Sequence, residues 1–140
     1  MIKLNRLPEN ILELLPGAVE YLEGHPKTIF AYLFGGLSGG TPLPLSDVDI
    51  AVYLADHLYV KEEKLDILGQ LTDILHTDEI DLVILNGAGL PIIINILKNK
   101  RIIVDKDPFA RHIFESLSMR KYFDFSVKEA ELLKRRYLHG

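Results

Sequence analysis

Apolar residues recur at helical spacing near the start of the chain. Between Leu7 and Glu23 they fall every three or four positions, which predicts an amphipathic helix: Ile11, Leu14, Leu15, Ala18, Val19 and Leu22. Pro8 suits the first turn of this helix, and Pro16 is expected to kink or break it. The sequence Gly24-His25-Pro26 is expected to end it.

Short runs of β-branched, aliphatic and aromatic residues predict three strands, over 28–34, 47–54 and 79–85. Residues 101–104 are a possible fourth strand at the edge of the sheet. The Gly-rich stretch 35–46 is expected to be a loop with at most one helical turn. Helical spacing returns over 59–76. Residues 90–98 are expected to form a short buried helix, although their three consecutive isoleucines would also suit a strand.

The C-terminal part of the chain carries two helix-start signals. Asp107-Pro108 predicts an N-cap followed by a first-turn proline, and that helix is expected to run to about Tyr122. Ser126, with Glu129 three residues later, predicts the start of a second helix that ends near Leu138. Alternating helices and strands indicate an α/β (α+β) fold, a small mixed β-sheet flanked by helices. We expect one domain over 1–140, with a helical C-terminal segment of about 107–140.

Composition narrows the class of protein. The chain has 140 residues, of which 48% are hydrophobic and 26% charged, as in a globular domain. Its net charge of −4 argues against a dedicated nucleic-acid binder. With no cysteine, disulfides and thiolate zinc sites are excluded. No apolar run is long enough to span a membrane, and residues 1–6 lack the apolar core of a signal peptide, so we expect a cytoplasmic protein.

Two aspartates open an otherwise apolar strand. Asp47 and Asp49 are two positions apart, so their carboxylates point to the same face. Because two such charges repel each other, a bound cation would relieve the repulsion, and Mg²⁺ prefers carboxylate and phosphate oxygens. Asp81 lies near the start of the next strand, 79–85, and repeats the pattern. If the two strands are neighbours, three carboxylates can surround one or two metals, and one of them can activate an attacking hydroxyl.

A glycine-rich loop precedes the aspartate strand. It reads Gly35-Gly36-Leu37-Ser38-Gly39-Gly40. Glycines allow close backbone approach, and exposed N–H groups can bind phosphate oxygens. The loop is neither a Walker A motif nor a dinucleotide-binding G-x-G-x-x-G. Each feature alone has an ordinary structural explanation, such as a turn or a strand-end carboxylate. Their order along the chain is more specific, and it favours nucleotide chemistry.

This arrangement resembles the signature of the DNA polymerase β-like nucleotidyltransferase superfamily. The glycine-rich loop is followed by five residues and then Ser46-Asp47-Val48-Asp49, with the spacing of that signature. The short chain, and the C-terminal helices with Tyr122-Phe123-Asp124-Phe125 between them, look like the minimal nucleotidyltransferase (MNT) antitoxins, which are encoded beside HEPN-domain toxins. The resemblance is strongest over residues 31–85.

The resemblance implies a polymerase β-like nucleotidyltransferase fold and a role for each motif residue. The triphosphate of ATP would be bound by the loop residues Gly35, Gly36 and Ser38, together with Ser46. Mg²⁺ would be held by the carboxylates of Asp47, Asp49 and Asp81, which are also the implied catalytic residues. Asp81 would lie nearest the acceptor hydroxyl. The partner would be a HEPN-domain toxin.

Two positions depart from the superfamily pattern, because Gly36 replaces a serine and Gly39 replaces an arginine. Several functions therefore stay open. The first is AMP transfer from ATP to a tyrosine of the toxin. The others are nucleotide binding without catalysis, in an antitoxin that acts by covering its toxin, and modification of a small hydroxyl compound, as by aminoglycoside nucleotidyltransferases. A glycosyltransferase is a more distant alternative.

Overall fold

The computed structural model describes residues 7–36 and 47–138. Within these ranges the elements are α1 (Ile11–Gly24), β1 (Thr28–Phe34), β2 (Val48–Leu54), α2 (Val60–Leu75), β3 (Ile80–Ile84), α3 (Leu90–Asn99), β4 (Arg101–Asp105) and α4 (Pro108–Leu138). Each predicted strand is found within one residue of its expected ends. Local apolar patterning is therefore sufficient to locate the strands of this fold.

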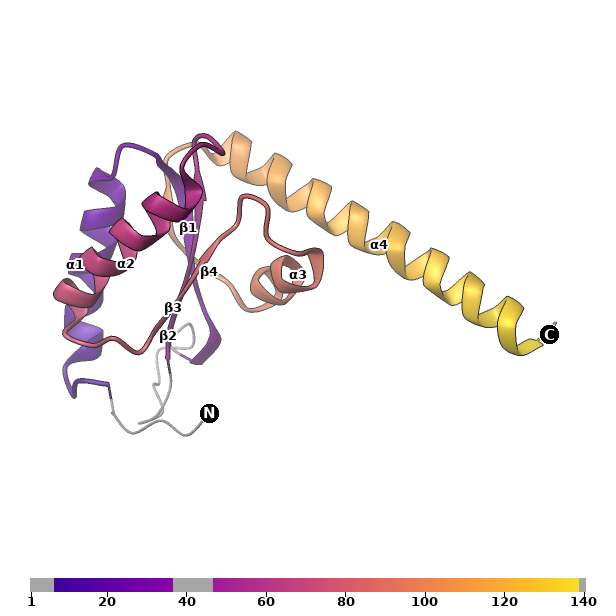
Figure 1. The fold of residues 1–140 in the computed structure, drawn as a ribbon, viewed down its shortest axis with the longest axis horizontal. Coiled ribbons are helices and arrows are strands. Elements are labelled where there is room, and N and C mark those ends of the chain that lie inside the picture. The colour runs from indigo at the N-terminus through magenta and orange to yellow at the C-terminus, as the bar shows by residue number, and fades with distance from the viewer. Residues whose placement is uncertain (1–6, 37–46, 139–140) are drawn as a thin grey trace.

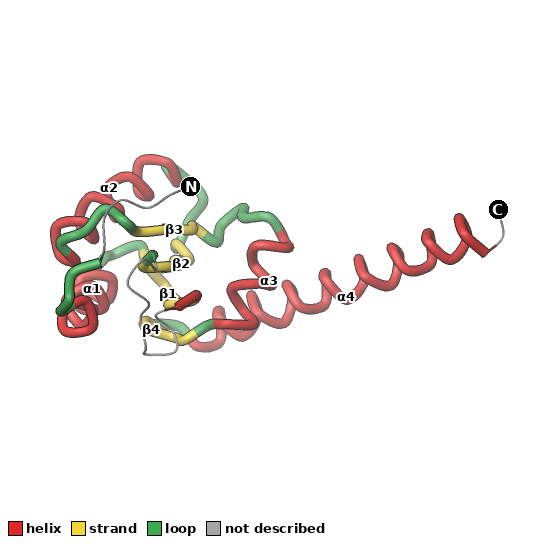
Figure 2. The backbone as a smooth tube through the Cα atoms, turned by 90° about the horizontal axis from the view of Figure 1, so that it is seen from below, coloured by secondary structure: helices red, strands yellow, loops and turns green. Residues whose placement is uncertain are grey.

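The strands form one mixed sheet in the order β3-β2-β1-β4, as Figure 2 shows from below. β1 runs antiparallel to both β2 and β4, while β2 and β3 are parallel. A parallel pair needs a crossover connection, and α2 supplies it. The expected small mixed sheet, with 101–105 at one edge, is confirmed.

Both faces of the sheet are apolar, and helices cover both. Alternate residues of the central strands, such as Leu33 and Ile50, pack in a core with α1 and α2. The intervening residues, such as Phe30 and Ala51, pack in a second core with α3 and the first part of α4. Figure 1 shows α1 and α2 on one side of the sheet and α3 and α4 on the other.

α1 runs without a break through Pro16, so the expectation that this proline breaks the helix is wrong. Proline lacks the N–H that would bond to the carbonyl four residues earlier, here that of Leu12. Leu12 lies in the first turn and is 44% exposed. Water can therefore reach this part of the helix, which lowers the cost of the missing bond.

α4 is one helix of 31 residues, not the two that were expected. Its predicted start is confirmed, because a carboxylate oxygen of Asp107 accepts a hydrogen bond of 3.1 Å from the N–H of Ala110. The predicted second start at Ser126 is wrong. No glycine or proline separates Phe109 from Leu138, so nothing in the sequence stops the first helix before it reaches the capping signal. None of the described helices, α4 included, is long and apolar enough to cross a membrane.

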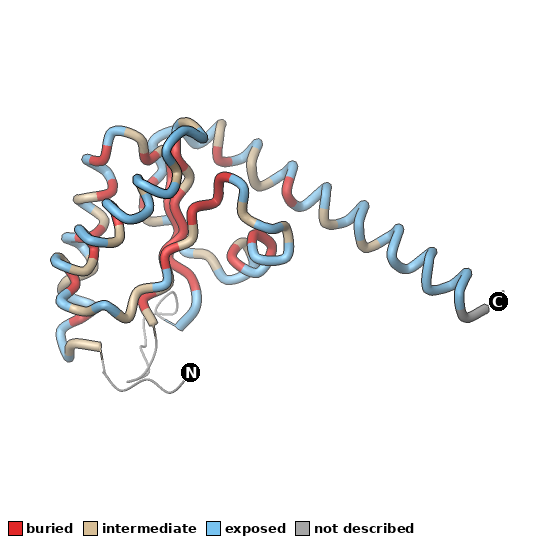
Figure 3. The backbone as a smooth tube through the Cα atoms, viewed as in Figure 1, coloured by how far each residue is buried: buried red, intermediate tan, exposed pale blue. Residues whose placement is uncertain are grey.

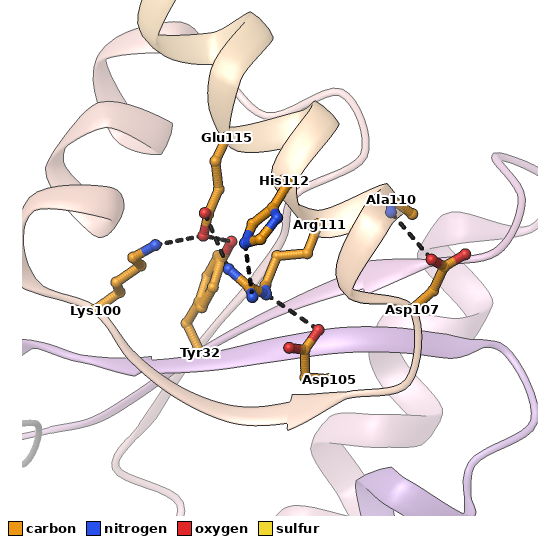
Figure 4. Close-up of polar contacts among 8 residues, drawn as sticks. All are labelled: Tyr32, Lys100, Asp105, Asp107, Ala110, Arg111, His112 and Glu115. Carbon is orange, nitrogen blue, oxygen red and sulfur yellow. Dashed lines mark hydrogen bonds and ion pairs between the residues drawn. The ribbon is translucent and has the colours of Figure 1, made fainter.

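A half-buried ionic cluster fixes the first part of α4 against the sheet (Figure 4). The hydroxyl of Tyr32, on β1, donates a hydrogen bond of 2.7 Å to the carboxylate of Glu115 on α4. The same carboxylate accepts hydrogen bonds from Lys100 and, at 3.1 Å, from Arg111. Arg111 also forms an ion pair with Asp105 of β4, with 3.0 Å between Nε and Oδ1. One carboxylate thus ties α4 to the central strand and to the turn before β4.

The environment of Glu115 shifts the titration of the cluster. Burial raises the pKa of this carboxyl, but hydrogen bonds from Lys100 and Tyr32 outweigh burial, so its pKa lies below the ordinary value. Burial and the neighbouring carboxylate both raise the pKa of the Tyr32 hydroxyl, which therefore stays protonated and remains a donor. A carboxyl with a lowered folded-state pKa stabilises the fold above its unfolded-state pKa, and that stability is lost as pH falls.

We predict that Glu115→Gln lowers the free energy of unfolding at pH 7 by about 2 kcal/mol, because it leaves buried cations poorly paired. The difference from wild type should shrink as pH falls below the ordinary carboxyl pKa of 4.5. Urea unfolding at pH 7 and pH 3 measures both values. Glu131→Gln, at an exposed position on the same helix, is the matched control and should change little. An equal loss of stability at both pH values would show that the charge of Glu115 is not responsible.

Candidate active site

Asp47 and Asp49 lie where β2 begins. Asp47 directly precedes the strand and Asp49 is its second residue. The residues that alternate with them, Val48 and Ile50, are buried in the core beside α1 and α2. Side chains alternate along a strand, so the two half-buried carboxylates lie on the opposite face, on the side of α3 and α4. The alternation of β2 agrees with the expected shared face of the two aspartates, and their role in metal binding stays a prediction.

Asp81 lies beside them on the neighbouring strand. β2 and β3 are parallel partners, and their register pairs Asp49 with Asp81. Residues paired in this way point to the same face, and the Cα atoms of adjacent strands lie about 5 Å apart. The carboxylate of Asp81 is on the exposed edge strand, whereas Asp49 is half-buried. The structure therefore meets the condition under which the third aspartate can act with the first two.

Gly35 contacts Asp49 directly. It follows the last residue of β1, Phe34, which is the register partner of Asp49 on the antiparallel side. Gly35 has φ of +69°, and a Cβ atom placed on it would lie 2.1 Å from Oδ2 of Asp49. Glycine is thus required both by backbone conformation and by lack of space. The sequence indicated a glycine for phosphate binding, but not this contact with the carboxylate.

The remaining candidate residues are placed only in part. Gly36 continues the short turn after β1 and is exposed. Ser38 and Ser46, the other residues expected to bind the triphosphate, lie outside the described residues, as does Gly39. The described part of the site is therefore the row formed by Gly35, Asp49 and Asp81, with Asp47 before it.

The donor atoms fit a particular kind of metal site. Within residues 7–36 and 47–138, no three His, Cys, Asp or Glu side chains are gathered closely enough to hold a metal ion. The aspartates thus do not form a closed protein cage. Mg²⁺ is commonly held by one or two carboxylates, several waters and the phosphates of a substrate. The all-oxygen set at the start of β2 fits Mg²⁺ that arrives with a nucleoside triphosphate.

A separate hollow of about 510 Å³ lies at the other end of the strands. Its lining includes Tyr53 near the end of β2, Asn86 after β3 and Phe114 on α4. Tyr53 is four residues beyond Asp49, or roughly 13 Å along the strand. Sequence reasoning did not find this hollow, because it forms only where β2, the turn after β3 and α4 meet. It is not part of the aspartate site.

Comparison with protein-family models assigns the chain to one family. Residues 18–109 match the family model described as polymerase beta, nucleotidyltransferase. This span includes Gly35, Asp47, Asp49 and Asp81. A comparison with curated proteins gave no match for the chain.

Solved structures of toxin–antitoxin systems share the fold. A chain from a mutant MntA–HpeT toxin–antitoxin crystal structure is 26% identical, with a TM-score of 0.64, over 91% of this chain and 96% of the other. A chain from a toxin–antitoxin structure with AMP-PNP is 25% identical, with a TM-score of 0.65, over 89% and 94%. A third, from a tri-AMPylated Shewanella oneidensis HEPN toxin in complex with its MNT antitoxin, is 22% identical, with a TM-score of 0.60, over 89% and 91%.

The expected resemblance to MNT antitoxins is confirmed by these likenesses, and the expected polymerase β-like fold is confirmed with it. The family model covers well over half of the chain and contains the aspartate strand, the neighbouring Asp81 and the glycine that contacts Asp49. The chain therefore belongs to the polymerase beta nucleotidyltransferase family.

Proposed function

We propose that this protein is a Mg²⁺-dependent adenylyltransferase that transfers AMP from ATP to a tyrosine of a cognate HEPN-domain toxin, in the cytoplasm, and so acts as its antitoxin. The observation that carries the proposal is the pairing of Asp49 with Asp81 across two parallel strands, with Gly35 against the carboxylate of Asp49. Two kinds of relative support the choice of nucleotide and acceptor: one was solved with AMP-PNP, and another holds an AMPylated HEPN toxin.

In the proposed reaction, Asp47 and Asp49 hold Mg²⁺ together with the triphosphate of ATP, and Asp81 completes the carboxylate set on the acceptor side. The metal would supply charge neutralisation at the phosphates. Asp81 takes the proton of the tyrosine hydroxyl. The hydroxyl oxygen then forms a bond to the α-phosphorus, the bond from that phosphorus to the bridging oxygen breaks, and pyrophosphate leaves. The turn after β1, with Ser38 and Ser46, binds the triphosphate.

The difference in exposure supports this division of roles. Asp49 lies between β1 and β3 and is half-buried, as suits a carboxylate that must hold a cation in a fixed place. Asp81 is exposed on the edge strand, where an incoming protein can reach it. An acceptor approaching from the β3 edge would therefore meet Asp81 first.

A second function is favoured by one sequence feature. Gly36 and Gly39 remove a hydroxyl and a cation that other members of the superfamily carry in this loop. Loss of charge-assisted hydrogen bonds weakens phosphate binding. An antitoxin that binds nucleotide without transferring it is therefore the alternative, and the Asp81 experiment below distinguishes the two.

We predict that Asp47→Asn abolishes Mg²⁺-dependent ATP binding, because it removes one of the two carboxylates that hold the cation. Isothermal titration with ATP in the presence of Mg²⁺, and again with EDTA, measures this dependence. Asp56→Asn is the matched control, since Asp56 follows the far end of β2 and should bind as wild type does. Equal binding by wild type and Asp47→Asn would rule out this metal assignment.

For Asp81→Asn we expect a different result, because its carboxylate is proposed to act on the acceptor. ATP affinity should stay within about threefold of wild type, while transfer falls by a factor of about 100 or more, the usual contribution of a general base. Intact-mass spectrometry of the toxin, after incubation with ATP and Mg²⁺, counts the added AMP groups. If wild type adds no AMP and still neutralises the toxin, the non-catalytic function is correct.

We predict that Gly35→Ala abolishes ATP binding, whereas Gly69→Ala, on α2, does not. The new methyl group would overlap Oδ2 of Asp49, and alanine disfavours φ of +69°. We expect loss of ATP binding and a fall in the free energy of unfolding of at least about 1 kcal/mol. Gly69→Ala, in open space on α2, should instead raise stability by up to about 1 kcal/mol through helix propensity. Thermal unfolding and titration of ATP would contradict this account if the two variants behaved alike.

A further inference from the structure

Much of α4 has no partner among the described residues of the chain. Within residues 108–136 of the helix, Ser118 is the last buried residue, and residues 119–136 are exposed or half-buried (Figure 3). Figure 1 shows this part projecting away from the sheet on the side of α3. Six large apolar side chains in this part are each at least 41% exposed, and we refer to them as the free apolar face: Met119, Phe123, Phe125, Val127, Leu132 and Leu133.

The free apolar face continues the side of α4 that packs on the domain. At 100° per residue, Glu115 and Ser118, which face the domain, fall in the same sector of the helix as Leu133 and Phe125. Between positions 119 and 136 the opposite sector, about 100° wide, holds only charged residues: Arg120, Lys121, Asp124, Lys128, Glu131 and Arg135. The projecting part of the helix is therefore amphipathic, whereas Ile113 and Leu117 fall in this same sector in the first part of the helix.

An exposed apolar face on a projecting helix is typical of a surface that binds a second molecule. Helices without tertiary packing are marginal in water below about 15 residues, and most helical stability in proteins comes from an apolar face that is covered. Apolar clusters on a projecting element mark interaction sites. Nζ of Lys98, on α3, lies 5.8 Å from the centroid of the Tyr122 ring, so α3 contacts α4 just beyond Ser118. The rest of the free apolar face extends beyond this contact.

Charge indicates what kind of molecule covers it. Between positions 119 and 136 there are six basic and three acidic residues, although the whole chain carries −4. Pairing α4 with α4 of a second copy would bring two basic helices together, which repel each other. A partner with acidic side chains around an apolar groove would complement both properties of the helix.

We propose that the free apolar face of α4 docks a partner protein with an apolar groove rimmed by acidic side chains. This inference rests on the proposed function in one respect, namely that the docked partner is the acceptor of AMP. α3 and α4 lie on the same side of the sheet as Asp47 and Asp49. A protein bound to the projecting part of α4 is therefore held on the side of the sheet where the aspartates lie.

The test is the affinity of the cognate HEPN-domain toxin, measured by isothermal titration. Phe123→Ser/Leu133→Ser should weaken binding at least about 30-fold, as expected for buried anchors at the centre of an interface. Leu58→Ser/Leu65→Ser is the matched control: both leucines are at least 66% exposed and neither lies on α4. It should stay within about threefold of wild type. Phe123→Leu/Leu133→Met should retain binding, and circular dichroism checks that every variant is folded.

The other outcomes overturn the proposal. Unchanged toxin affinity in Phe123→Ser/Leu133→Ser would do so directly. If that variant also turned a wild-type dimer into a monomer in sedimentation, the face would belong to a second copy. If it lost binding to a single-stranded RNA of 20 nucleotides instead, the occupant would be RNA. Failure of the proposed function looks different: toxin binds through α4, and the variant weakens it, but no AMP is ever added.

Discussion

The whole fold depends on a central sheet with two apolar faces and one charged end. β1 and β2 are buried along both faces, so layers of helices must cover both. α1 and α2 cover one face, and α3 with the start of α4 covers the other. Burying a carboxylate costs several kilocalories per mole. Asp47, Asp49 and Asp81 lie where this cover ends, and they are half-buried or exposed. The position of the candidate site is therefore set by the same burial that stabilises the domain.

Placing like charges together at this end of the sheet costs electrostatic free energy. Three aspartates on adjacent strands repel one another, and replacing any of them by an apolar or amide residue would relieve the repulsion. Gly35, at φ of +69°, leaves room for the carboxylate of Asp49, and glycine is the residue that adopts this conformation readily. The row of carboxylates thus breaks a local rule at one point of an otherwise consistent fold. Such violations concentrate at functional sites, which is the physical basis for assigning chemistry here.

Local patterning predicted the strands and the shared face of Asp47 and Asp49, because a period of two is a property of neighbouring residues. The position of Asp81 could be predicted only conditionally, since the parallel register of β2 and β3 is decided by the crossover through α2. The hydroxyl of Tyr32 bonds to Glu115, 83 positions away, and no local signal reports such a pair. Ser126 and Glu129 form a local capping signal, but the helix that begins at Pro108 continues through them because no residue interrupts it.

The first part of α4 is bonded to the sheet, whereas its second part projects from the domain. This difference suggests how a small domain can act on a protein substrate. The first part is fixed by Glu115, which is bonded to one residue each from β1, the turn before β4 and α4 itself. Because the first part of α4 is fixed to the sheet, a partner that binds the projecting part loses its orientational freedom when it docks. Orientation of the acceptor can lower a reaction barrier by several kilocalories per mole. If the partner is the acceptor, the site has no need of a lid or a second domain, because the substrate brings its own binding surface.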